Sequence, residues 1–143
     1  MTDLDYAKEW LKISERDYAS AKHLETMHPM PYEVICYLSQ QSVEKSLKAI
    51  LAFNNTAIAK THDIKLLYNQ CKNYTDKVFL DNNIADLITK FATTSRYPDE
   101  MYEFTHEDAK LALKYANQVL EQVKQAVGIS EEVPETKEQQ LET

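Results

Sequence analysis

Gly128 is the only glycine among the 143 residues of this chain. Tight hairpin turns and the phosphate-binding loops of nucleotide-binding α/β folds depend on glycine, because it adopts positive φ angles at little cost. A sheet protein or a P-loop protein therefore fits this sequence poorly. No segment alternates apolar and polar residues over the length of a strand. We expect long helices joined by few loops.

The length of 143 residues fits one domain, and a composition of 43% hydrophobic and 27% charged residues is typical of globular proteins. The net charge of the chain is −7, and residues 128–143, with five Glu and one Lys, contribute −4 of it. We expect a folded domain over residues 1–127 and an acidic, disordered tail over 128–143. The domain itself is mildly acidic, so a contact with nucleotide or RNA has to be local.

Several classes of protein are excluded by what the sequence lacks. Cys36 and Cys71 form no C-x-x-C pair, which indicates reduced, half-buried thiols of a cytoplasmic protein. No H-x-x-x-H pair or cysteine cluster is present, so we expect no metal and no cofactor. The first ten residues are acidic and amphipathic, unlike a signal peptide. No apolar run approaches the roughly 20 residues of a membrane span.

Apolar residues at helical spacing predict an all-α fold: a single-domain, antiparallel, up-and-down bundle of four to five helices. Thr2 or Asp3 would cap the first helix and Thr61 the third, and Pro31 suits the first turn of the second. Residues 105–108 resemble a capping box, and Gly128 would end the last helix. The expected helices span about residues 3–27, 31–53 and 61–71, a stretch after residue 76, and residues 106–127.

The second helix presents a polar line between two apolar seams. The line consists of Tyr37, Gln41, Glu44 and Lys48; one seam contains Cys36, Val43, Leu47 and Ile50, the other Val34, Leu38, Ala49 and Ala52. The polar line is either a solvated face or the lining of a cleft, where each polar group needs a hydrogen-bond partner. The flanking seams favour the cleft. The apolar side chains of the second seam have to be buried against another surface, and a second copy of the chain would supply it. We therefore predict a two-fold homodimer.

Residues 37–51, YLSQQSVEKSLKAIL, resemble the central helix of HEPN domains, whose pattern reads roughly Q-x-x-E-K-x-L-K-A. Three further segments resemble the same family in the correct order. They are W-L followed by E-R-D-Y and Ala21 in the first helix, T-H-D-I from Thr61, and S-R-Y-P from Ser95. The resemblance extends from residue 4 to about residue 125.

This resemblance implies a helical bundle that dimerises, with polar functional residues at or near the dimer cleft. Many members accompany a nucleotidyltransferase in bacterial or archaeal toxin–antitoxin pairs, and many others are metal-independent endoribonucleases. In the nucleases an Arg is followed after four to six residues by a His. The His assists attack by the 2′-hydroxyl or protonates the leaving oxygen, and the Arg stabilises the phosphorane. Here nine residues separate Arg96 from His106, and Tyr102 occupies the region expected for the His.

The candidate catalytic residues are therefore Arg96 and His106. The candidate ligand-binding residues are Gln41, Glu44, Lys45, Lys48, His62, Arg96 and Tyr97. For three of these residues two interpretations stay open. His62 either hydrogen-bonds backbone in the first turn of the third helix or joins Glu44 and Lys48. His106 is either an exposed first-turn residue or a catalytic one. Arg96 either pairs with Asp99 or Glu100, or faces a phosphate.

Three functions remain as hypotheses. The first is a non-catalytic or weakly catalytic HEPN-type module that binds a nucleotide or RNA phosphate through Lys45, Lys48 and Arg96. It would act as a homodimer beside a nucleotidyltransferase partner. The second is a metal-independent endoribonuclease that uses Arg96 and His106, and the third is a purely structural interaction domain. The missing short Arg-to-His spacing favours the first hypothesis over the second.

Overall fold

The computed structural model describes residues 1–93 and 102–129, and within these ranges all regular structure is helical. The expected all-α fold is thus confirmed. The elements are α1 (Asp3–His23), a short 3-10 helix (Leu24–Thr26), α2 (Tyr32–Phe53), α3 (Ile64–Cys71), α4 (Asn82–Thr93) and α5 (His106–Ala126).

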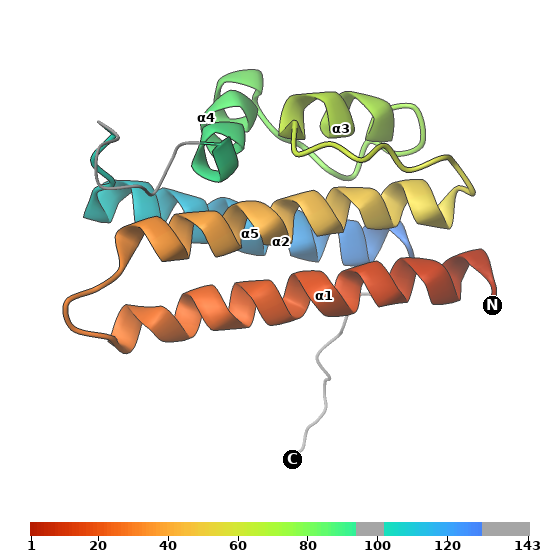
Figure 1. Cartoon of the computed structure of the whole chain (residues 1–143). Coiled ribbons are helices and arrows are strands. Elements are labelled where there is room, and N and C mark those ends of the chain that lie inside the picture. The colour runs from red at the N-terminus through yellow and green to blue at the C-terminus, as the bar shows by residue number, and fades with distance from the viewer. Residues whose placement is uncertain (94–101, 130–143) are drawn as a thin grey trace, which may run out of the picture.

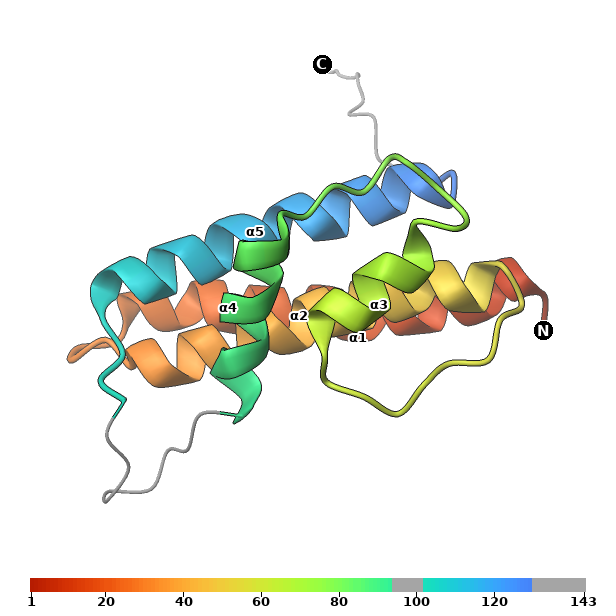
Figure 2. The ribbon, with the colours of Figure 1, turned by 90° about the horizontal axis from the view of Figure 1, so that it is seen from above.

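The three long helices α1, α2 and α5 lie side by side, and α3 and α4 pack across them (Figures 1 and 2). Helix α2 contacts all four of the others. The up-and-down order holds for α1 and α2, which are joined by a short connection. Helix α5 runs in the same direction as α2, because α3, α4 and their connections return the chain to the starting end (Figure 1). The central position of α2 explains its two apolar seams.

Capping boxes begin both α1 and α5. The Thr2 hydroxyl accepts a hydrogen bond from the Asp5 N–H at 3.0 Å, and the Asp5 carboxylate accepts one from the Thr2 N–H at 3.1 Å. Thr105 and Asp108 form the same reciprocal pair at 3.1 and 3.0 Å. Just beyond α5, Gly128 has a φ of +81°, the left-handed conformation expected of a residue that ends a helix.

Three local predictions are corrected. The first helix ends at His23 and tightens into the 3-10 helix instead of continuing to residue 27. Thr61 does not cap α3. Asp63 does so by accepting from the Leu66 N–H at 3.1 Å, while the Thr61 hydroxyl accepts from the Asp63 N–H in a local turn. Finally, Cys36 and Cys71 are fully buried rather than half-buried, and burial raises the pKa of each thiol to about 12.

The second seam of α2 is partly covered by the chain itself. Ala49 and Ala52 are buried within the single chain, whereas Val34 and Leu38 are half-buried. The apolar surface that would favour a dimer is therefore smaller than the sequence predicts. Within residues 1–93 and 102–129, none of the helices combines the length and the apolar character that crossing a membrane requires.

Candidate functional site

The carboxylate of Glu44 lies at the centre of a polar cluster on α2, and its side chain is only 1% exposed. Its Oε2 atom pairs with Nζ of Lys48 at 2.9 Å and with Nζ of Lys45 at 3.4 Å. Its Oε1 atom lies 2.8 Å from Nδ1 of His62 and accepts from the Gln40 amide at 3.2 Å. Gln41 completes the set, because its Oε1 accepts from Lys45 Nζ at 2.9 Å. We call these six residues the Glu44 cluster.

Helical spacing and one loop assemble the Glu44 cluster. Gln40, Glu44 and Lys48 are four residues apart on α2 and therefore share one face. His62 comes from the connection between α2 and α3, and the Gln40 amide also donates to the His62 backbone carbonyl at 3.4 Å. From α1, Trp10 lies beneath the Lys48 ammonium, which is 5.7 Å from the centre of its ring.

Opposing effects act on the Glu44 carboxyl. Burial by itself raises its pKa, but hydrogen bonds from His62 and Lys48, the charge of Lys45 and a hydrogen bond from Gln40 together lower the pKa below 4.5. The group is therefore ionised at neutral pH. Two lysines share this one negative charge, which leaves one positive charge in the cluster. The burial of Asp17 on α1 raises the pKa of its carboxyl, and the nearby charge of Lys45 lowers that pKa by less.

The structure decides two of the open alternatives. The solvated-face interpretation of the polar line is wrong, because Glu44 and Lys48 are only 1% and 6% exposed. His62 precedes α3 and contacts the Glu44 carboxylate, so the interpretation that placed it in the first turn of that helix is wrong as well. Five sequence candidates meet in the cluster: Gln41, Glu44, Lys45, Lys48 and His62.

The other candidates lie elsewhere. Arg96 and Tyr97 fall outside the described residues, as do Asp99 and Glu100. His106 is the first residue of α5, is exposed, and meets the edge of Tyr32 at 5.8 Å between ring centres. Tyr32 begins α2, and Glu44 is twelve residues further along, a distance of about 18 Å on the helix axis. His106 is therefore not part of the Glu44 cluster.

Two contributors to the site, Gln40 and Trp10, are not among the candidates predicted from the sequence. Gln40 is completely buried and bonded to Glu44, and its position one turn before that residue is the signal that could have identified it. The helical spacing places Trp10 only on the core face of the first helix. Its contact with Lys48 depends on how α1 packs against α2, which the spacing of apolar residues does not reveal.

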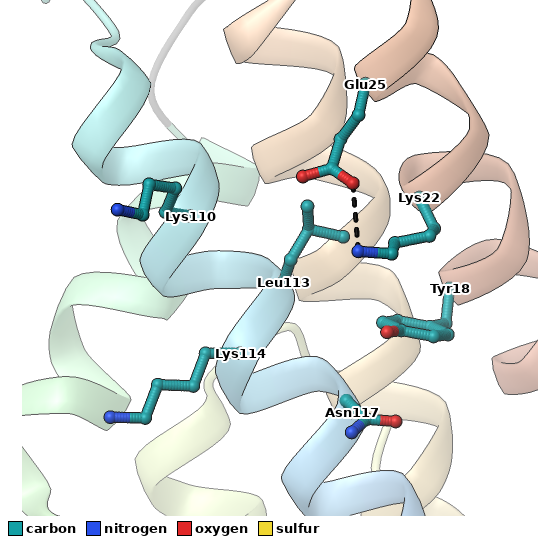
Figure 3. A pocket seen from close by; sticks show the side chains of 7 residues that line it. All are labelled: Tyr18, Lys22, Glu25, Lys110, Leu113, Lys114 and Asn117. Carbon is teal, nitrogen blue, oxygen red and sulfur yellow. Dashed lines mark ion pairs between the residues drawn. The ribbon is translucent and has the colours of Figure 1, made fainter.

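A separate hollow of about 250 Å³ lies between α1 and α5 (Figure 3). Lys22 and Glu25 form an ion pair of 3.0 Å on its α1 side. In Figure 3 the side chains of Lys110 and Lys114 extend together away from that pair. The hollow contains no residue of the Glu44 cluster. Within the described residues no group of His, Cys, Asp and Glu could hold a metal ion.

The sequence pattern of the HEPN domain matches residues 7–126. The chain belongs to the HEPN domain family. It is 31% identical to a Methanocaldococcus jannaschii protein named "Putative toxin MJ1304", over 85% of this chain and 88% of that protein. The match confirms the family that the four sequence segments indicated.

Two solved structures share the fold of this HEPN chain. The crystal structure of TT1696 from Thermus thermophilus has a TM-score of 0.67 and 22% identity, covering 84% of this chain and 97% of that one. The crystal structure of ST0689, described as an archaeal HEPN homologue, has a TM-score of 0.58 and 26% identity, covering 85% and 97%.

Proposed function

We propose that this HEPN chain is a toxin-like module that binds the phosphate of a nucleotide or RNA at the Glu44 cluster. The observation that carries the proposal is the sharing of one buried carboxylate by Lys45 and Lys48. Burying an ion pair costs free energy unless the geometry of the pair is good. A second lysine on the same carboxylate leaves one positive charge of the Glu44 cluster uncompensated, and that charge attracts an anion. The name of the M. jannaschii relative supports the toxin-like part of the proposal.

Exposure indicates which atoms would meet the phosphate. The side chain of His62 is 64% exposed and that of Lys45 is 18% exposed, whereas that of Lys48 is only 8% exposed. Lys45 and His62 would therefore contact the anion directly. The buried Lys48 would attract the anion through its charge without touching it. Arg96 is a further proposed contact, since a guanidinium suits bidentate contacts with phosphate.

A binding experiment with matched variants tests this proposal. The probe is a labelled single-stranded RNA with 2′-O-methyl riboses, which binds through its phosphates but has no free 2′-hydroxyl to react. Lys45→Ala should weaken binding roughly 10-fold or more and reduce the salt dependence, because a charge-assisted contact is lost. Lys110→Ala removes an exposed lysine from α5 and is the control. Equal affinities for both variants and the wild type would leave the structural interaction domain as the better hypothesis.

The association state is a separate part of the proposal. We propose a homodimer that acts beside a nucleotidyltransferase in a toxin–antitoxin setting, as the family resemblance implies. The half-buried side chains of Val34 and Leu38 provide apolar surface for the dimer. Light scattering at micromolar concentration should give twice the mass of the chain. A monomer under these conditions would contradict the homodimer without affecting the phosphate site.

A second candidate function rests on His106. This residue is exposed at the start of α5, where its ring meets the edge of Tyr32, and an exposed imidazole is a common group for proton transfer. An endoribonuclease that uses Arg96 and His106 would cleave RNA in the presence of EDTA and lose that activity in both Arg96→Ala and His106→Ala. Unchanged cleavage by His106→Ala would exclude this candidate.

A further inference from the structure

Two aromatic side chains lie one helical turn apart on α1. The ring centres of Tyr6 and Trp10 are 6.2 Å apart and the rings are inclined by 60°, which is a favourable geometry for an aromatic pair. Tyr6 is 43% exposed, whereas Trp10 is half-buried. The more deeply packed Trp10 therefore supports the Tyr6 ring, and α1 presents an aromatic surface to solvent.

This aromatic pair borders the Glu44 cluster. The ammonium of Lys48 lies 5.7 Å from the centre of the Trp10 ring and 2.9 Å from the Glu44 carboxylate. Asp17 comes seven residues after Trp10, on the same face of α1, and the charge of Lys45 acts on its carboxyl. One face of α1 thus follows the cluster along α2, with the aromatic pair at one end and Lys45 toward the other.

The distance between the two ends is comparable to the size of a nucleotide. Tyr6 is one turn beyond Trp10 on α1, and Lys45 precedes Lys48 by three residues on α2. Because the two helices run in opposite directions, these two displacements point away from each other and amount to about 10 Å along the helix axes. A base and the phosphates that flank it can bridge a distance of this size.

The charges near Tyr6 favour an uncharged group at that end. The first turn of α1 contains Asp3 and Asp5, whose carboxylates repel a phosphate. A nucleic-acid base is uncharged at neutral pH, and it stacks on an aromatic side chain whatever its identity. The aromatic end therefore suits a base, and the lysine end suits a phosphate.

We propose that Tyr6, supported by Trp10, forms a stacking subsite for a base of the ligand whose phosphate lies at the Glu44 cluster. This inference rests on the proposed phosphate site and adds the part of the ligand that the lysines do not contact. It also narrows the class of ligand. In a duplex each base is stacked between its neighbours, so its face is not available to Tyr6. The ligand is a nucleotide or a single strand, and its base sequence matters little.

The experiment compares two strands of equal length and equal 2′-O-methyl backbone, one with bases and one without. Fluorescence anisotropy of an end label measures the affinity of each strand. The wild type should bind the base-bearing strand more tightly. Tyr6→Ala should weaken binding of that strand roughly 5- to 100-fold, the usual effect of losing one stacked base, and should leave the affinity for the abasic strand unchanged.

Two further variants control for the loss of an exposed ring. Tyr6→Phe retains the aromatic face and should bind both strands as the wild type does. Phe79→Ala removes a ring that is 63% exposed on the connection between α3 and α4, where its backbone is bonded to Gln118 and Gln122 of α5. This variant should also bind both strands normally. Thermal unfolding should verify that all the variants fold.

Trp10 provides a second readout, because it is the only tryptophan of the chain. A base stacked on Tyr6 lies next to the indole and should quench its fluorescence. The abasic strand places only sugar and phosphate there, so it should leave the emission almost unchanged. Equal quenching by the two strands would contradict a base at this position.

The results separate the stacking subsite from the phosphate site. Equal affinities of the wild type for the two strands, or a Tyr6→Ala variant that binds the base-bearing strand normally, would overturn the stacking subsite. If Lys45→Ala weakens binding of both strands while Tyr6→Ala weakens neither, the phosphate site stands and the stacking subsite is wrong. If Tyr6→Ala weakens binding of the base-bearing strand but Lys45→Ala has no effect, the base lies at Tyr6 and the phosphate contact is wrong.

Discussion

Ser14 of α1 and Ser42 of α2 each donate a hydrogen bond to the other's backbone carbonyl. The Ser14 hydroxyl lies 2.8 Å from the carbonyl oxygen of Ser42, and the Ser42 hydroxyl lies 3.0 Å from that of Ser14. The Ser46 hydroxyl joins them, 2.7 Å from the Ser14 oxygen, and all three residues are completely buried. Small side chains at this crossing let α1 approach α2 closely, which brings Trp10 of α1 to Lys48 of α2.

Ser14→Ala should destabilise the protein by about 1–3 kcal/mol. The substitution removes the donor to Ser42 and leaves the buried Ser46 hydroxyl without that partner, which costs a desolvation penalty of this size. Denaturant unfolding measures the change. Ser20→Ala, on the exposed side of the same helix, is the control and should change stability by less than about 0.5 kcal/mol.

Glu44→Gln should be among the most destabilising single substitutions. It leaves the ammonium of Lys48, whose side chain is 8% exposed, without its counter-charge, and breaking a buried ion pair in this way costs about 3–5 kcal/mol. Adding Lys48→Met removes the uncompensated charge. The double variant should therefore be more stable than Glu44→Gln alone. A double variant less stable than the single one would show that Lys48 has its main partner elsewhere.

The stability contributed by Glu44 should depend on pH. Because its pKa is lowered in the folded state, its contribution is fully present above the unfolded value of 4.5 and is lost as the pH falls through the folded pKa. The difference in unfolding free energy between the wild type and Glu44→Gln should thus be largest above about pH 5 and shrink under acid conditions. A difference that grows on acidification would contradict the lowered pKa.

Gly128→Ala should cost about 1–2 kcal/mol, although the new methyl group meets no other atom within 4 Å. The cost arises from the backbone, whose φ of +81° disfavours a side chain. Gly128→Asn should be less harmful, since Asn tolerates this conformation better than Ala. Thermal unfolding of the two variants provides the measurement, and equal losses for Ala and Asn would indicate a cause other than φ.

Local signals in the sequence predicted most of the fold. Thr105 and Asp108 predict the start of α5, and Gly128 its end, because caps and positive φ depend on residues close in the chain. Helical spacing likewise placed Glu44 and Lys48 on one polar line, and their i, i+4 separation accounts for the ion pair between them. The contact of His62 with Glu44 depends on the path of a connection and stayed an open alternative. Thr61 and Asp63 are both good caps, and spacing alone did not distinguish them.

Trp10→Phe should change stability by less than about 1 kcal/mol, despite the size of the side chain. The indole N–H of Trp10 is buried and has no hydrogen-bond partner among residues 1–93 and 102–129, so removing it relieves a desolvation cost. The substitution also weakens the attraction between the ring and the Lys48 ammonium, a contribution of about 0.5–2 kcal/mol that opposes the gain. Trp10→Leu removes the aromatic face as well as the N–H and should be clearly less stable than Trp10→Phe. If the two variants unfold at the same denaturant concentration, Lys48 gains nothing from the ring, and Glu44 alone holds it in place.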